Sequence, residues 1–145
     1  MKPNTAAKVL SWLLILMGGL ALLAIVPMVM PVGWMEAVND SMGLGPFHRS
    51  PLMGYLTRSL SAVYALFGAL TLYLGLNARR YLPLIVVVGW LTVAFGVALT
   101  GIDFAVGMPA SWSWGEGPPT IVIGWVFVRL ARRAATAPLN AAGSR

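Results

Sequence analysis

The chain of 145 residues contains no cysteine and only one histidine, His48. Without cysteine it cannot form a disulfide, carry out thiol redox chemistry or bind a metal through thiolates. A single histidine cannot supply paired axial ligands for a membrane haem, and the few acidic residues lack the spacing of a two-metal site. We therefore expect no metal, no cofactor and no catalytic residue that the sequence alone identifies.

Charged residues are also scarce, at 10% of the chain, whereas hydrophobic residues make up 59%. The mean hydropathy of +0.81 is far above that of soluble domains. A net charge of +6 could suggest nucleic acid, but the basic residues lie in short flanks of long apolar runs. This placement favours a membrane protein, and we expect no nucleic-acid partner.

The apolar runs predict an all-α membrane fold, a bundle of four transmembrane helices. The third run is the clearest, because about 34 Å of helix would separate Arg80 from Asp103, slightly more than the bilayer core. The predicted spans cover residues 9–30, 54–76, 82–106 and 118–134. Together they make one domain, residues 1–134, followed by a disordered cytoplasmic tail, residues 135–145.

Two of these spans have competing interpretations. The first follows Lys2 and Lys8 as a secretory signal would, but it is longer than a usual signal core and no cleavage site follows it. The fourth is short if Pro118 and Pro119 open its helix, since proline is tolerated in a first turn. Either the bilayer thins there, or the preceding loop, Trp112 to Gly117, dips inward.

The signs of the charges are separated by these spans. If all four cross, eight of the ten basic residues share one side: Lys2, Lys8, Arg79, Arg80, Arg129, Arg132, Arg133 and Arg145. The other side carries all the acidic residues with the remaining two arginines: Glu36, Asp40, Asp103, Glu116, Arg49 and Arg58. The positive-inside rule then places both termini in the cytoplasm, and we expect a bacterial inner membrane protein.

The first outer loop has its own pattern. Residues 33–45 are too polar to span, and Trp34 and Val38 would share one helical face opposite Glu36 and Asp40. This predicts a short interfacial helix stopped by Gly43, with an ordinary ordered loop as the alternative. Residues 45–51 are predicted to form a turn with little regular structure.

Small residues predict close helix packing inside the membrane. A stripe of Ala62, Ala65 and Ala69, with Gly68 and Gly75 nearby, marks the second span, and a similar stripe marks the third with Gly89 and Gly96. Small side chains let helices approach closely in lipid, where apolar burial alone provides no drive to associate.

The candidate ligand site is a set of polar and aromatic residues predicted to converge at the outer ends of the helices. Its members are Tyr55, Arg58, Asp103, Trp114, Glu116 and His48. One interpretation is a pocket for a lipid headgroup, a quinone or another lipophilic small molecule. The other is a structural salt bridge between Arg58 and either Asp103 or Glu116. The outer methionines with His48 also allow a copper(I) site, although packing explains them better.

The architecture resembles that of the DoxX-like group of small bacterial membrane proteins. The resemblance covers roughly residues 9–134 and rests on the four spans, the short helix in the first outer loop and the Arg79–Arg80 hairpin. Two sequence segments are more similar to an uncharacterised subfamily of this group. One is Tyr55 to Ser61, and the other begins with Gly101 to Asp103 and ends with Gly115 to Pro118. The resemblance implies quinone-linked or accessory roles beside redox enzymes and transfers no catalytic residue.

These observations predict a non-catalytic accessory or ligand-binding membrane protein with a polar outer mouth. The alternative is a quinone- or lipid-active enzyme, or enzyme subunit, that uses Asp103 or Glu116 as an acid or base. Expected partners are membrane lipid, a quinone or similar molecule, and a membrane protein or a second copy of the chain.

Overall fold

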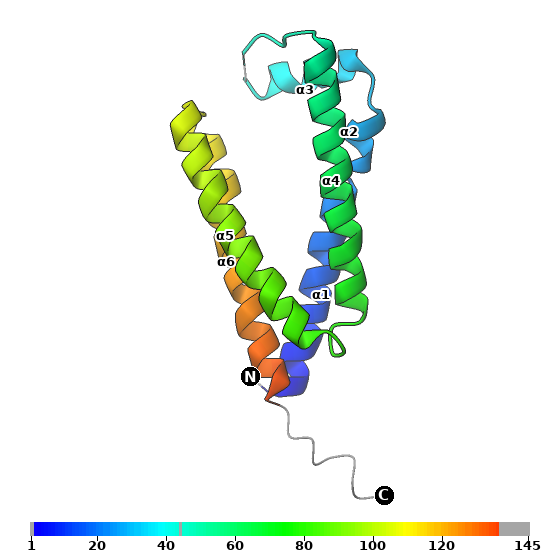
Figure 1. Ribbon diagram of the computed structural model, residues 1–145, viewed down its shortest axis with the longest axis vertical. Coiled ribbons are helices and arrows are strands. Elements are labelled where there is room, and N and C mark those ends of the chain that lie inside the picture. The colour runs from blue at the N-terminus through cyan, green and yellow to red at the C-terminus, as the bar shows by residue number, and fades with distance from the viewer. Residues whose placement is uncertain (1, 44, 137–145) are drawn as a thin grey trace, which may run out of the picture. The chain divides into compact units, whose positions relative to one another are not determined.

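The computed structural model describes residues 2–43 and 45–136, and this part of the chain contains helices and turns but no strand. The helices are α1 (Pro3–Leu22), α2 (Ile25–Val29), α3 (Val32–Ser41), α4 (Pro51–Leu76), α5 (Leu82–Val106) and α6 (Ala110–Ala135) (Figure 1). They form two compact units. Unit 1 comprises residues 1–13 and 76–145, and unit 2 comprises residues 14–75.

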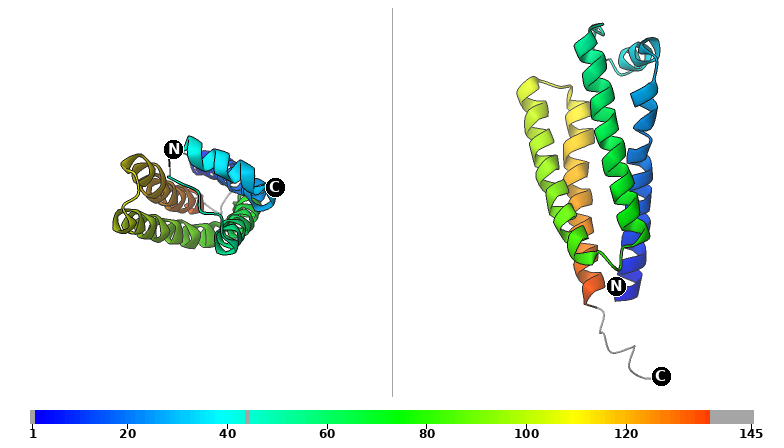
Figure 2. Two further views of the ribbon diagram at one scale, coloured as in Figure 1. Left: turned by 90° about the horizontal axis from the view of Figure 1, so that it is seen from above. Right: turned by 45° about the vertical axis from the view of Figure 1, so that its right-hand side comes forward.

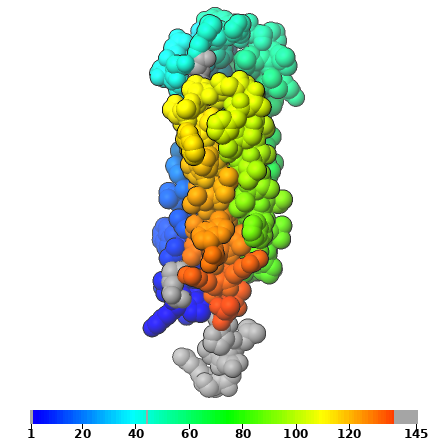
Figure 3. Space-filling view, turned by 90° about the vertical axis from the view of Figure 1, so that its left-hand side faces the viewer, coloured from blue at the N-terminus to red at the C-terminus, as the bar shows by residue number. Residues whose placement is uncertain are grey.

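In unit 1, α5 and α6 pack as an antiparallel pair along a seam of glycines (Figures 2 and 3). Gly89 lies against Gly124, and Gly96 lies against Gly117. A Cβ atom on Gly124 would sit 2.7 Å from the carbonyl oxygen of Gly89, so a side chain there would push the helices apart. The predicted glycine stripe of the third span therefore forms a helix contact, as expected for packing in lipid.

In unit 2, the later turns of α1 pack against α4 in the same manner. A Cβ on Gly68 of α4 would lie 2.6 Å from the backbone nitrogen of Leu22. The buried small residues of α4 are Ser61, Ala65, Gly68 and Gly75. The predicted stripe of Ala62, Ala65 and Ala69 is therefore right only at Ala65, since Ala69 is exposed. The two glycines allow a closer approach than alanine does, and they set the contact face.

Three helical stretches are long and apolar enough to cross a membrane: Pro3–Val29, Pro51–Leu76 and Leu82–Val106. Each carries large apolar side chains that are more than half exposed, such as Leu16, Phe67 and Leu91. Such a surface suits lipid rather than water. The chain is thus a small helical membrane protein, and three of its four predicted spans coincide with these stretches.

The predicted start of the fourth helix is wrong. α6 begins at Ala110, contains Pro118 and Pro119 in its interior, and runs for 26 residues, about 39 Å. The prolines cannot donate to the carbonyls of Trp114 and Gly115, but these two residues are exposed, so water or lipid headgroups can serve their carbonyls. The fourth helix is therefore not short, although α6 is not among the stretches apolar enough to span.

The first run is interrupted near its end. α1 stops at Leu22, residues 23–24 form a turn, and α2 carries Pro27. Proline lacks the N–H that would continue the α1 hydrogen-bond ladder, which accounts for the break. The predicted span 9–30 is thus two helices, with α1 beginning earlier, at Pro3.

The predicted helix of the first outer loop is confirmed as α3. It ends before Gly43, whose φ of 66° is the left-handed conformation that glycine readily adopts beyond a helix end. Met35 is buried, whereas Trp34 is 66% exposed. Of residues 45–51, predicted to form an irregular turn, residues 45–50 have no regular structure, as expected. Pro51 is instead the first residue of α4. Of the predicted tail, Ala135 ends α6, and residues 137–145 lie outside the described residues.

Candidate functional site

The six candidate site residues are divided between the two units. His48, Tyr55 and Arg58 belong to unit 2, whereas Asp103, Trp114 and Glu116 belong to unit 1. Their convergence into one pocket, and the alternative salt bridge of Arg58 with either acid, therefore stay predictions.

In unit 2, Arg58 has a local structural role. Its Nη2 donates to the carbonyl oxygen of Met30 at 3.3 Å, and its Nη1 donates to that of Gly54 at 3.4 Å. Met30 follows the last turn of α2, where carbonyl groups lack helical partners, so the arginine stabilises this helix end. Tyr55 is 67% exposed. The exposed His48 has Nδ1 3.0 Å from the carbonyl oxygen of Pro46.

Unit 1 holds the more unusual group, at the end of the pair where α5 finishes and α6 begins, which we call the Asp103 end. Asp103 is only 6% exposed, and its Oδ2 atom is buried without a hydrogen-bond partner. Its carbonyl accepts hydrogen bonds from the N–H groups of Gly107 and Met108, both at 3.0 Å. The backbone that carries the carboxylate is therefore held by the turn that ends α5.

Ser113 faces the same interface from α6. It is 2% exposed, and its Oγ atom is also buried without a partner. The glycine seam fixes the register, because Thr100 lies against Gly117. One turn further along both helices, the antiparallel register brings Asp103 and Ser113 to the same level. Two unpartnered polar side chains thus share the Asp103 end.

Glu116 is arranged differently from the prediction. It lies inside α6 rather than just before the helix, so it does not occupy the helix N-terminus. Its Oε2 accepts a hydrogen bond of 2.6 Å from the indole Nε1 of Trp112, one turn earlier. Trp114 is 68% exposed. The carboxylate of Glu116 therefore has a partner within α6, in contrast to that of Asp103.

Ser113 and Trp112 are two residues of this region that were not among the predicted site residues. Ser113 precedes Gly117 by four residues and Gly124 by eleven, so it lies on the glycine face of the same helix. That spacing was available in the sequence, but the expected helix began at Pro118 and left Ser113 in a loop.

The chemistry of the Asp103 end is that of a hydrogen-bond acceptor. A buried polar group without a partner costs about 1–3 kcal/mol, and more if it is charged. A donor that reached Asp103 Oδ2 and Ser113 Oγ would recover this cost. Among residues 2–43 and 45–136, no group of three His, Asp or Glu side chains could hold a metal ion.

Unit 2 has an ion pair on its surface, between α3 and the segment that follows it. Arg49 Nε and Nη2 donate to the two carboxylate oxygens of Glu36 at 2.5 and 2.6 Å. This side-chain hydrogen bonding lowers the pKa of Glu36 and raises that of Arg49. A cavity of about 310 Å³ lies beside the pair, lined by residues that include Met35, Phe47 and Arg49.

Comparisons with known proteins identify no relative of this chain: no family model, no curated protein and no solved structure matches it. The resemblance to the DoxX-like group therefore stays a prediction based on architecture.

Proposed function

We propose that this protein is a non-catalytic membrane protein that binds a lipophilic molecule at the Asp103 end. The observation that carries the proposal is the pair of buried, unpartnered polar atoms, Asp103 Oδ2 and Ser113 Oγ. A ligand that donates a hydrogen bond to Asp103 Oδ2 would give this buried oxygen the partner that it lacks. Exposed apolar side chains of the same end of α5, Ile102, Phe104 and Val106, would contact the rest of such a ligand.

The proposal favours a ligand with hydroxyl groups over one with carbonyl groups only. A carboxylate accepts hydrogen bonds and cannot donate them, so a quinol fits Asp103 better than the corresponding quinone does. A hydrogen bond from a hydroxyl to a charged carboxylate contributes more binding free energy than one from a hydroxyl to a neutral acceptor. A reduced quinone is therefore the probe that we would test first.

The proposal includes four membrane crossings, with α6 as the fourth. Its 26 residues are long enough, and it packs along α5, which is itself apolar enough to span. A span that buries its polar face against a neighbour needs less apolar surface of its own. The basic end of each crossing would then face the bacterial cytoplasm.

The test begins with purification of the full chain in gentle detergent and mass spectrometry of what remains bound. Thermal unfolding is then followed with a short-chain quinol or the matching quinone added. We expect the quinol to raise the melting temperature more than the quinone does. Asp103→Asn should weaken the apparent affinity about tenfold, since it replaces a charged acceptor with a neutral one.

The matched serine variants provide the control. Ser113→Ala should reduce quinol stabilisation, whereas Ser111→Ala, at an exposed position of the same helix, should not. Equal responses of Asp103→Asn and the unmodified chain would exclude this site. A stoichiometric membrane protein in place of a small molecule would instead favour an accessory role.

A quinone- or lipid-active enzyme is the second candidate, because an acid–base group also needs an unoccupied position for a proton. Asp103 offers such a position, whereas the carboxylate of Glu116 is engaged by Trp112. In an enzyme, Asp103→Asn would abolish turnover of the bound lipid or quinone.

A further inference from the structure

A second polar site lies at the opposite end of unit 1, which we call the basic end. Here α5 begins, α6 ends and the first turns of α1 lie beside the turn before α5 (Figure 1). A cavity of about 380 Å³ opens between residues 7–12 of α1 and residues 76–80. This volume lies within the range of small-molecule sites.

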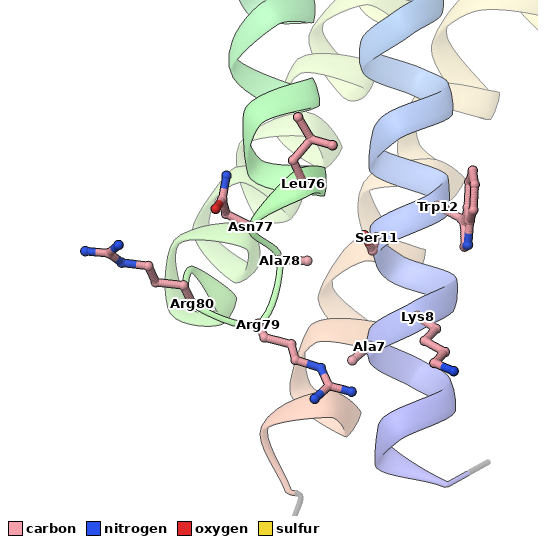
Figure 4. Close-up of a pocket in the computed structure, with 9 residues that line it drawn as sticks. All are labelled: Ala7, Lys8, Ser11, Trp12, Leu76, Asn77, Ala78, Arg79 and Arg80. Atoms are coloured by element: carbon pink, nitrogen blue, oxygen red, sulfur yellow. The ribbon is translucent and has the colours of Figure 1, made fainter.

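Two cations frame the cavity from different segments. Lys8 comes from α1 and Arg79 from the turn after α4. In Figure 4 the guanidinium group of Arg79 extends toward Ala7 of α1, whereas the side chain of Lys8 projects from the other side of that helix. Arg80 also borders the cavity, but its side chain points away from Arg79 in that view. The guanidinium carbon of Arg80 lies 5.5 Å from the centre of the Tyr81 ring, within the range of a cation–π contact.

The positive charge of the basic end has no acidic counterpart there. The described acidic residues of unit 1 are Asp103 and Glu116, which lie near the end of α5 and the start of α6, away from the basic end. Further arginines of α6, Arg129, Arg132 and Arg133, add to the charge near the basic end. An anion that entered the cavity would therefore meet cations without competition from a nearby carboxylate.

The rim of the cavity is apolar on its exposed side. Trp12 and Leu76 both line the cavity, and they are 72% and 67% exposed. A tryptophan beside cations is typical of the boundary between headgroups and acyl chains. The cavity thus combines cations for an anionic group with an apolar border for hydrocarbon.

We propose that this cavity binds the phosphodiester headgroup of an anionic membrane lipid, with Arg79 contacting the phosphate, Lys8 adding positive charge at the cavity, and Trp12 and Leu76 contacting the acyl chains. The apolar rim favours a lipid over a free phosphate, since a water-soluble anion would gain nothing from exposed tryptophan and leucine. Basic pockets between spanning helices recognise such headgroups by the same combination.

The test uses the full chain in detergent, titrated with phosphatidylglycerol, phosphatidylcholine or soluble glycerol phosphate. Binding is followed by native mass spectrometry and by the melting temperature. Phosphatidylglycerol should bind more tightly than the other two. Arg79→Gln and Lys8→Gln should each weaken its binding about fivefold, the loss expected for one cation at a membrane surface.

Arg80→Gln is the matched control, because it removes the same charge from a neighbouring residue whose side chain points elsewhere. It should weaken binding less than twofold, and Arg79→Lys should retain most of the affinity. Equal losses for Arg79→Gln and Arg80→Gln would show that charge alone attracts the lipid and would overturn the site. Equal binding of phosphatidylcholine would overturn the anion preference, and equal binding of glycerol phosphate would overturn the lipid assignment.

The variants also separate a binding defect from a folding defect. Lys8 and Arg79 are exposed, so the lipid-free melting temperature should stay unchanged in both variants. Loss of lipid binding with an unchanged melting temperature would support the proposal, whereas unaltered binding in the double variant Lys8→Gln, Arg79→Gln would contradict it.

Discussion

The Glu36–Arg49 pair of unit 2 and the Asp103 end of unit 1 surround a carboxylate in opposite ways. Glu36 lies in α3 on the surface, and an exposed arginine from the segment after α3, Arg49, donates to both of its oxygens. Asp103 is buried in a helix contact, and its Oδ2 has no partner. Water can serve the first carboxylate and cannot easily reach the second.

This difference indicates where stability and function separate. An exposed ion pair adds little to stability, and a carboxylate there can be replaced at small cost. A buried acceptor without a partner lowers stability, and groups of this kind are common at functional sites. The comparison therefore indicates a structural role for Glu36 and supports the proposed binding role of Asp103, and three changes test it.

The largest effect should come from opening the seam that buries Asp103. Gly124→Ala would place a Cβ 2.7 Å from the Gly89 carbonyl oxygen and 2.8 Å from the backbone nitrogen of Val93. Because backbone atoms cannot swing aside, the helices must separate, and we expect a loss of about 1–3 kcal/mol in the free energy of unfolding. Thermal unfolding in detergent measures this loss.

Gly115→Ala is the control for that change, because nothing lies within 4 Å of a Cβ at this position of α6. It should leave stability unchanged or raise it slightly, since alanine favours helix more than glycine does. If both substitutions had the same effect, the glycine seam would not be a close helix contact, and the burial of Asp103 would need another explanation.

The second change removes the charge of Asp103 itself. Asp103→Asn should stabilise the ligand-free protein by about 1 kcal/mol or more, because it replaces a buried charged acceptor with a neutral group whose burial costs less. Most substitutions of a paired carboxylate act in the opposite direction. Chemical or thermal unfolding of the ligand-free protein gives the sign directly.

A destabilised Asp103→Asn variant would mean that the carboxylate has a partner after all, and Arg58 would be the first residue to examine. Combining Asp103→Asn with Arg58→Gln distinguishes these cases. Additive effects would leave the two residues independent, whereas a restored stability in the double variant would support the predicted salt bridge.

Helix positions followed from the sequence wherever long apolar runs met a clear end. The third run, residues 82–106, matches α5, and the second, residues 54–76, ends with α4. The ends of these two spans beside Arg80 were predictable, because a charge in hydrocarbon is costly and therefore fixes where a span can stop. The short helix α3 was predictable from its apolar face and from Gly43.

The errors came from proline and from the choice of helix face. Pro118 and Pro119 favour a helix start, yet α6 passes through them, and this error removed Ser113 from consideration. Gly68 and Gly75, predicted near the stripe of alanines, lie on the contact face of α4, whereas the alanine spacing itself indicated a face that is partly exposed. The neighbouring helix determines which face of α4 forms the contact, and the sequence of α4 alone does not specify that neighbour.

The smallest effect on stability should come from removing the ion pair between Glu36 and Arg49. The hydrogen bonds from Arg49 lower the pKa of Glu36 below its usual value of 4.5. A carboxyl whose pKa is lowered by folding contributes stability above its unfolded pKa, and this contribution is lost as the pH falls through the folded value. We therefore expect Glu36→Gln to be slightly less stable than the unmodified chain near neutral pH.

The difference in melting temperature between the two proteins should shrink as the pH falls below about 4.5, because protonation then removes the same charge that the substitution removes. A control variant, Asp40→Asn, changes an exposed acid on the same helix and should leave the melting temperature near neutral pH unchanged. If the difference between Glu36→Gln and the unmodified chain instead grew on acidification, Glu36 would not be a stabilising carboxylate. Glu36 could then no longer serve as the example of a paired, stabilising carboxylate with which the unpaired Asp103 is compared.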